Sequence, residues 1–152
     1  MEKLVNNNDS RAVRNMNNII SLHEVMINQR KPEEAVEKYL DPGYIQHDPL
    51  LETGAAGLVK FFKQVVAEHP TASWTAKRII AVDNYVWVHS NFRNIFNDDP
   101  NDTGIAGVDI FIMNDEGKAI EHWEVLQLVG TSGNAAPWVA PNLKALNTNG
   151  IF

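Results

Sequence analysis

The chain has 152 residues, enough for one domain with a proper core, and 44% of them are hydrophobic while 21% are charged. These proportions are typical of globular proteins and argue against disordered and fibrous classes. The 13 Lys and Arg residues are outnumbered by 19 Asp and Glu residues, giving a net charge of -6, and no basic cluster occurs. We therefore expect no nucleic-acid partner and no attraction to an anionic membrane surface.

Cysteine is absent, which excludes disulfides, thiolate metal sites and a cysteine nucleophile. The N-terminal segment lacks the apolar core of a signal peptide, and no apolar run approaches the roughly 20 residues that cross a bilayer. We predict a cytoplasmic protein with no membrane span. Residues 1–152 should form a single domain, with a core at about 10–129 and a tail at 130–152 that packs on it through Trp138, Leu143, Leu146 and Phe152.

Three helices are predicted in the first half of the chain. The first should begin after Asp9 or Ser10, whose side chains can cap a helix, and carry an apolar stripe that includes His23. A short second helix is expected from Pro32 to Leu40, ended by Asp41-Pro42-Gly43. The third should span about 55–68 and end before Pro70. The stripe of the first helix is Val13, Met16, Ile20, His23 and Ile27, and the broad face of the third is Leu58, Phe61, Phe62, Val65 and Val66.

After Pro70 the hydrophobic period changes from helical to strand-like. Strands are predicted at 73–82, 85–96, 105–113 and 118–129, with a short extended segment at 44–47 before the third helix. Helices followed by an antiparallel meander indicate an α+β domain in which three N-terminal helices pack on a curved antiparallel sheet.

The last predicted hairpin places ionisable residues among apolar ones. Because strand side chains alternate between faces, an even-length turn after Met113 puts Asp109 opposite His122 or Glu124, so that all three share one face. An odd-length turn puts Trp123 opposite Asp109 instead. The sequence does not decide between an even-length and an odd-length turn.

Two motifs resemble a known family. The segment Tyr-Ile-Gln-His-Asp-Pro at 44–49 and the segment Gly-Lys-Ala-Ile-Glu-His-Trp-Glu-Val at 117–125 are similar to motifs of the SnoaL-like family of the nuclear-transport-factor-2-like superfamily. The resemblance covers about 20–129. It implies a cone-shaped α+β fold, usually a homodimer, with a pocket between the sheet and the first helices. Members cyclise polyketides by an aldol reaction, and more distant relatives isomerise ketosteroids, dehydrate small molecules or open epoxides.

The resemblance also assigns candidate catalytic residues. Asp48 occupies the place of the base in steroid isomerases, and Asp109 matches the carboxylic acid of their Val-Asp-x-Phe segment. His122 and Glu124 match pocket-facing positions of the last strand. His23 stands where many relatives have a tyrosine.

Each candidate also has an ordinary structural interpretation. A buried Asp109 is costly unless paired or protonated, so it either transfers protons at a raised pKa or is satisfied by Arg93 or His122. Glu124 could orient the His122 imidazole or compete with it as base, or His122 could be a core residue. Pro49 holds Asp48 in an extended conformation, and we expect one of His47 and Asp48 to point inward.

The predicted substrate-binding residues come from several segments. His89 and Trp87 share a strand face with mixed aromatic and polar residues, which suits either a ligand cavity or a dimer surface. Close histidine spacing typical of zinc motifs is absent, so we expect no metal, and no nucleotide-binding motif indicates a cofactor. The full set of expected substrate-binding residues is His23, His47, His89, Trp74, Trp87, Phe61 and Phe62.

The sequence thus predicts a small-molecule pocket protein that works on a hydrophobic substrate by acid/base chemistry next to a carbonyl, without a cofactor, as an isomerase, lyase or aldol-type cyclase. His122 oriented by Glu124, or else Asp48, would be the base, and a protonated Asp109 would donate a hydrogen bond to the enolate oxygen. The alternative is a non-catalytic ligand-binding or dimeric interaction module of the same fold.

Overall fold

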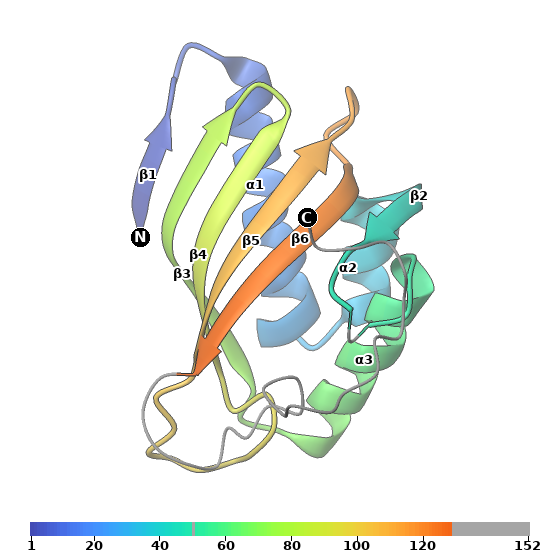
Figure 1. The fold of residues 1–152 in the computed structure, drawn as a ribbon, viewed down its shortest axis with the longest axis vertical. Helices are drawn as coiled ribbons and strands as arrows, with labels where there is room; N and C mark the ends of the chain where they lie inside the picture. The colour runs from blue at the N-terminus through green and yellow to red at the C-terminus, as the bar shows by residue number, and fades with distance from the viewer. Residues whose placement is uncertain (50, 129–152) are drawn as a thin grey trace.

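A computed structural model describes residues 1–49 and 51–128 (Figure 1). The tail predicted at 130–152, with its anchor residues, lies outside the described residues. The elements in chain order are β1 (Glu2–Val5), α1 (Ser10–His23), the π-helical turn η1 (Glu24–Asn28), α2 (Pro32–Tyr39), β2 (Leu40–Gln46), α3 (Ala55–Glu68), β3 (Ser73–Val82), β4 (Tyr85–Arg93), β5 (Ile105–Met113) and β6 (Ala119–Leu128).

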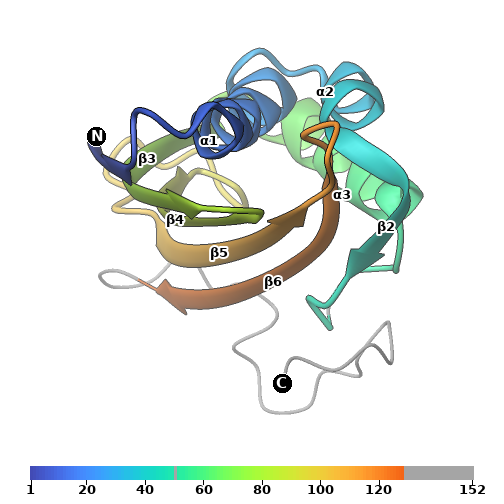
Figure 2. The same cartoon turned by 90° about the horizontal axis from the view of Figure 1, so that it is seen from above.

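The six strands form one curved sheet in the order β1-β3-β4-β5-β6-β2, and the helices cover its concave face (Figure 2). The predicted antiparallel meander is confirmed for β3 to β6. Two edge strands extend it, because β1 pairs in parallel with β3 and β2 pairs in parallel with β6. The sheet is therefore mixed, and the α+β class with three helices on one face is confirmed.

Helix α1 begins where the sequence predicts. The Asp9 carboxylate accepts hydrogen bonds from the backbone N–H groups of Arg11 and Ala12, which have no partner inside the helix. The buried face differs from the predicted stripe, since Val13 and Ile20 are only half-buried. The buried residues of this helix are Ala12, Asn15, Met16, Ile19, Leu22 and His23.

The other two helices agree with their predicted positions. Helix α2 starts at Pro32, whose missing N–H costs nothing in a first turn, and α3 spans Ala55–Glu68. A Cβ at Gly57 would lie 2.2 Å from the Glu52 carbonyl oxygen, so only glycine fits at this approach. The segment Asp41-Pro42-Gly43, expected as a simple stop, belongs to β2, where the pairing with β6 shifts register.

The β5–β6 hairpin contains a register shift that decides which residues share a face. Met113 pairs with Ala119, so the intervening turn at 114–118 has an odd number of residues. A shift between Ile112 and Met113 restores the even register, and Asp109 lies opposite Glu124. The expectation that Asp109, His122 and Glu124 share a face is confirmed, through a bulge rather than through the turn alone.

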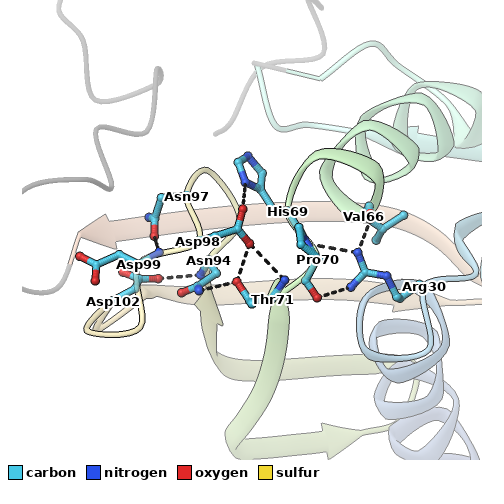
Figure 3. A network of polar contacts seen from close by, with 10 residues as sticks. All are labelled: Arg30, Val66, His69, Pro70, Thr71, Asn94, Asn97, Asp98, Asp99 and Asp102. Atoms are coloured by element: carbon cyan, nitrogen blue, oxygen red, sulfur yellow. Dashed lines mark hydrogen bonds and ion pairs between the residues drawn. The ribbon is translucent and has the colours of Figure 1, made fainter.

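A polar network ties the loop after β4 to the connection between α3 and β3 (Figure 3). Arg30 donates to backbone carbonyl groups of Val66, His69 and Pro70 at the end of α3. The Asp98 carboxylate accepts hydrogen bonds from the backbone N–H and the hydroxyl of Thr71 at 3.1 and 2.5 Å. These bonds hold the loop that follows the last residues of β4, next to one wall of the pocket described below.

Within residues 1–49 and 51–128, no helix is both long enough and apolar enough to cross a membrane.

Candidate functional site

A cavity of about 50 Å³ lies between the concave face of the sheet and the helices. Its apolar wall comes mainly from α1, α3 and the strand ends, and comprises Leu22, Met26, Leu51, Leu58, Phe61, Phe62, Phe92, Ile95, Ile105, Phe111 and Leu126. Its polar lining comes mainly from β2, β5 and β6 and comprises His23, Tyr44, Gln46, Asp48, Asp109, His122 and Glu124. Polar groups from separate segments therefore converge in an otherwise apolar hollow.

Asp109 on β5 stands at the centre of the polar lining and is 1% exposed. The Ser90 hydroxyl donates to its Oδ2 at 2.8 Å, while the Trp74 indole N–H donates to Ser90 Oγ at 2.9 Å. Because Ser90 Oγ accepts from the indole, its own proton is directed to the carboxylate. His122 Nε2 lies 3.4 Å from Asp109 Oδ1 on the other side. Arg93, the other partner considered from the sequence, instead binds the backbone carbonyl of Asp102.

His122 is held at both ring nitrogens. Its Nδ1 lies 3.1 Å from the Gln46 side-chain oxygen, and its Nε2 faces Asp109. The ring also stacks on Phe111, with centroids 4.3 Å apart. The prediction that Glu124 orients this imidazole is therefore wrong, because Gln46 holds that position.

Glu124 on β6 lies directly across from Asp109 in the hairpin. Burial raises the pKa of Glu124 well above its usual range, and the nearby charges of Asp109 and Asp48 raise this pKa further. A hydrogen bond with Asp109 acts in the same direction. These effects all favour the protonated form of Glu124. Gly107 lies close to Glu124 on the neighbouring strand, and a Cβ there would come within 2.7 Å of the Phe92 side chain.

The pKa of Asp109 is shifted in the direction opposite to that expected from the sequence. Burial would raise the pKa of Asp109, as expected, but the hydrogen bond and charge of His122, the charge of His23 and the Ser90 hydrogen bond outweigh burial and lower the pKa. These opposed shifts favour an ionised Asp109 and a protonated Glu124, which is the reverse of the protonated Asp109 expected from the sequence.

Asp48 lies on the pocket side of the chain and is 7% exposed, while its neighbour His47 does not line the cavity. His47 Nε2 pairs with Glu121 at 2.8 Å, and its ring stacks on Trp123 with centroids 4.3 Å apart. The expectation that one of the two points inward is met by Asp48. The substrate-binding role predicted for His47 does not fit this position.

His23 lines the pocket at the end of α1, where the π-helical turn η1 begins. Its Nδ1 bonds to the Ile19 carbonyl oxygen at 3.0 Å, and its ring stacks on Trp74 at 4.6 Å. Burial lowers the pKa of His23, and the charge of Asp109 opposes this effect. Nδ1 carries a proton, because the Ile19 carbonyl oxygen can only accept. Trp74 contacts both His23 and Ser90 and does not itself line the cavity.

Trp87 and His89 lie on the opposite, convex face of β4, because the inward residues of this strand are Val86, Val88 and Ser90. Trp87 is 46% exposed, and the His89 ring contacts Arg78 at 3.0 Å. Neither residue can reach a ligand in the pocket of its own chain. Of the two interpretations of this face, the ligand cavity is wrong, and the dimer surface stays a prediction.

Sequence reasoning missed Gln46, Ser90 and Tyr44. Gln46 is fully buried, and burial raises the pKa of Tyr44 well above its usual range, assisted by the charges of Glu124, Asp109 and Asp48. The sequence held a signal for Tyr44 and Gln46. Both have the same strand parity as Asp48, and one of His47 and Asp48 was expected to point inward. Ser90 shares strand parity with the apolar residue Val88, and nothing in the sequence marked it as a site residue.

Among the described residues, one group has metal-ligating atoms close together, namely Asp109, His122 and Glu124, all within 4.8 Å of one another. Two carboxylates and one imidazole are ligands that suit a divalent cation. Hydrogen bonds within the group and to Ser90 and Gln46 already account for its arrangement.

Solved structures share this fold at low sequence identity. A candidate polyketide cyclase from Bacillus cereus ATCC 10987 has a TM-score of 0.68 and 16% identity, with 83% of this chain and 84% of that chain covered. An NTF2-like protein of unknown function from Mesorhizobium loti has a TM-score of 0.62 and 10% identity, covering 84% and 99%. A steroid delta-isomerase from Pseudomonas aeruginosa has a TM-score of 0.54 and 14% identity, covering 78% and 81%.

These similarities establish the nuclear-transport-factor-2-like fold. A comparison with curated proteins finds no match. The model of the SnoaL-like domain family matches residues 22–122, which is more than half of the sequence. The chain belongs to the SnoaL-like family.

Proposed function

We propose that the protein is a cofactor-independent acid/base enzyme that acts next to a carbonyl group of a hydrophobic small molecule, as an isomerase, lyase or aldol-type cyclase. One observation supports this most strongly. Asp109 and Glu124 face each other at the polar end of an apolar pocket, and their pKa values are shifted in opposite directions. A base and an acid side by side are what removal of a proton next to a carbonyl requires.

In the proposed step, the Asp109 carboxylate takes a proton from the carbon next to the substrate carbonyl. The electron pair of the broken C–H bond forms the enolate, whose oxygen receives a hydrogen bond or the proton of Glu124. Return of a proton to another carbon gives an isomer, and attack of the enolate on a second carbonyl closes a ring. Every proton stays among the substrate, Asp109 and Glu124, so the step needs no oxidant or metal.

His122 serves this step indirectly. Both of its ring nitrogens are engaged, one by Gln46 and one by Asp109, so it has no nitrogen left to meet a substrate proton. Its contact with Asp109 instead stabilises the ionised carboxylate. Asp48 lines the same pocket and is the alternative base. His23, Phe61 and Phe62 line it as well and are proposed to contact the ligand.

The size of the cavity favours a compact ligand. Its volume of about 50 Å³ is far below the roughly 300–1,000 Å³ typical of pockets for drug-sized molecules. A polycyclic substrate would require the aromatic wall, including Phe61 and Phe62, to move outward. We therefore expect small ketones or aldehydes with an apolar group to bind better than steroid-sized molecules.

The proposal includes a homodimer formed through the convex face of the sheet. Large apolar side chains are exposed there on four consecutive strands, among them Val82 at 61%, Tyr85 at 45%, Trp87 at 46% and Val125 at 62%. Exposed aromatic residues gathered on one face are characteristic of protein interfaces.

A second candidate function is ligand binding without turnover. It is favoured by the way the polar groups satisfy one another, since both oxygens of Asp109 and both ring nitrogens of His122 already have partners. Such a site could recognise a carbonyl through Glu124 and leave it unchanged.

The two functions are distinguished by proton exchange. Wild-type protein is mixed in D₂O with a panel of ketones and aldehydes of increasing size, and proton loss next to the carbonyl is followed by NMR. The enzyme hypothesis predicts catalysed exchange that falls about 10²–10⁴-fold in Asp109→Asn, the usual contribution of general acid/base catalysis. Asp115→Asn, at an exposed position outside the cavity, is the matched control and should exchange like the wild type. Binding of a panel member without any exchange would support the binding module, and unchanged exchange in Asp109→Asn would remove Asp109 as the base.

A further inference from the structure

Gln46 is the buried hub of the polar lining. It comes from β2, is 0% exposed and joins three other residues of the site. Its side-chain oxygen Oε1 accepts from the backbone N–H of Asp48 at 3.0 Å and lies 3.1 Å from His122 Nδ1. Its side-chain Nε2 donates to the Tyr44 hydroxyl oxygen at 3.1 Å.

The orientation of this amide follows from the backbone. The Asp48 N–H can only donate, so the Gln46 atom that faces it must be the oxygen. The same oxygen faces His122 Nδ1, and a carbonyl oxygen can only accept. His122 Nδ1 must therefore carry a hydrogen. Nε2 faces Asp109 Oδ1, and an ionised carboxylate can only accept, so Nε2 donates to Asp109 when the ring carries a hydrogen on both nitrogens.

The opposite end of the amide determines the hydroxyl of Tyr44. Because Gln46 Nε2 donates to the phenol oxygen, the phenol proton is directed away from Gln46. Tyr44 lines the cavity together with the acceptor groups Asp48, Asp109 and Glu124.

We infer that Gln46 is a positioning residue of this site, which keeps a hydrogen on His122 Nδ1 and turns the proton of the Tyr44 hydroxyl away from itself. One buried amide thus sets the direction of two polar groups that belong to different segments. A hydrogen-bond partner that selects the tautomer of a site histidine is a general device in proteins. The inference concerns the resting protein and does not depend on turnover, so it can fail or hold independently of the proposed enzyme activity.

The tautomer of His122 can be read directly. Protein labelled with ¹⁵N at histidine is studied by long-range ¹H–¹⁵N correlation spectra, in which the pattern of couplings shows which ring nitrogen carries the hydrogen. His122→Gln identifies its signals. The wild type should show a hydrogen on Nδ1, either alone or together with one on Nε2, because the Gln46 oxygen that faces Nδ1 can only accept. A neutral ring with the hydrogen on Nε2 would overturn the inference.

Two substitutions with opposite expectations test the role of Gln46 itself. Gln46→Met keeps the length of the side chain but removes the acceptor, so the hydrogen should no longer be held on Nδ1 and should favour Nε2, which still faces Asp109. Gln46→Glu keeps an acceptor oxygen for His122 and Asp48, and should retain the Nδ1–H form. Gln64→Met, on the exposed side of α3, is the matched control. An unchanged tautomer in Gln46→Met would contradict the inference. If that variant fails to fold, loss of the Nδ1–H form in Gln46→Glu would contradict it equally.

Discussion

The two faces of the same sheet present opposite chemistry on consecutive residues. On the concave face, Ser90, Asp109 and His122 are at most 5% exposed and bonded to one another. On the convex face, Trp87 and Val125 are 46% and 62% exposed. The strands β4, β5 and β6 supply both sets, so strand parity alone separates the residues of the pocket from those of the outer surface.

This difference shows why residue type was a poor guide to the site. His89 and His122 look equally suited to proton transfer in the sequence, but only His122 faces the cavity. The same holds for the neighbours His47 and Asp48. A polar residue in a strand acquires a role from the face on which it lies and from the donors that other strands bring to that face.

The largest expected effect concerns the convex face. Trp87→Glu places a charge in the proposed dimer interface, and burying an unpaired charge is very unfavourable. We expect the mass measured by light scattering after gel filtration to fall from that of a dimer to that of a monomer. Lys63→Glu on the outer side of α3 should leave the dimer intact. A wild-type protein that is monomeric at all concentrations would contradict the assignment of this face.

A second prediction compares two valines on opposite faces, both changed in the monomeric Trp87→Glu background. Val88 is 0% exposed and packs in the core, so Val88→Ala should lower the free energy of unfolding by about 2 kcal/mol. Val125 is 62% exposed, and Val125→Ala should change it by less than about 0.5 kcal/mol. Urea denaturation measures both. Similar losses for the two variants would mean that the faces are not as different as the structure shows.

Glu124→Gln should change how stability depends on pH. The folded-state pKa of Glu124 is raised above its ordinary value of 4.5, so its neutral form stabilises the fold below that pH. This contribution is lost as the pH rises through the folded-state pKa. The amide introduced by the substitution cannot ionise, so the variant should lose this decline and melt at a higher temperature than the wild type near neutral pH. Thermal melts from pH 4 to 8 measure it, and parallel curves for both proteins would contradict the raised pKa.

Asp109 contributes in the opposite sense. Its pKa is lowered below the ordinary value of 3.8, so its stabilising effect is present above that pH and is lost as the pH falls below it. Acid unfolding of the wild type should therefore include a contribution that Asp109→Asn lacks.

The smallest effect is spectroscopic. Burial and the charges of Glu124, Asp109 and Asp48 raise the pKa of Tyr44 well above the ordinary value of 10.0. In an alkaline titration followed by phenolate absorbance, Tyr44 should not ionise while the protein stays folded. Tyr44→Phe should then show the same absorbance change as the wild type up to the pH of unfolding. A smaller change in Tyr44→Phe would mean that Tyr44 is accessible to hydroxide.

Local patterns predicted most of the fold. Periodicity and capping residues located α2, α3 and β5 at or within one residue of their observed bounds, because each is a regular element flanked by Pro, Gly or Asp. β4 was predicted to reach residue 96 but ends at Arg93, where Asn94 adopts a positive φ of 54° that no local pattern announces. β1 was missed because its four residues are defined by pairing with β3.

Only some members of the site were predictable, and their charges were not. Alternation with an even-length turn indicated that Asp109, His122 and Glu124 share a face, and the bulge in the hairpin keeps that register. The direction of the Asp109 pKa shift depends on Ser90 from β4 and on His122, which Gln46 from β2 holds. Such contacts between distant segments cannot be inferred from local sequence.

The central claim is that Asp109 is ionised and Glu124 is protonated in the same pocket. The most direct test is carbon-detected NMR of the side-chain carboxyl groups, assigned with Asp109→Asn and Glu124→Gln and followed from pH 3 to 8. We expect Asp109 to have the chemical shift of a carboxylate across the neutral range, and Glu124 to keep that of a protonated acid well above pH 4.5. A Glu124 that ionises at its ordinary pKa, or an Asp109 that is protonated at neutral pH, would contradict the account.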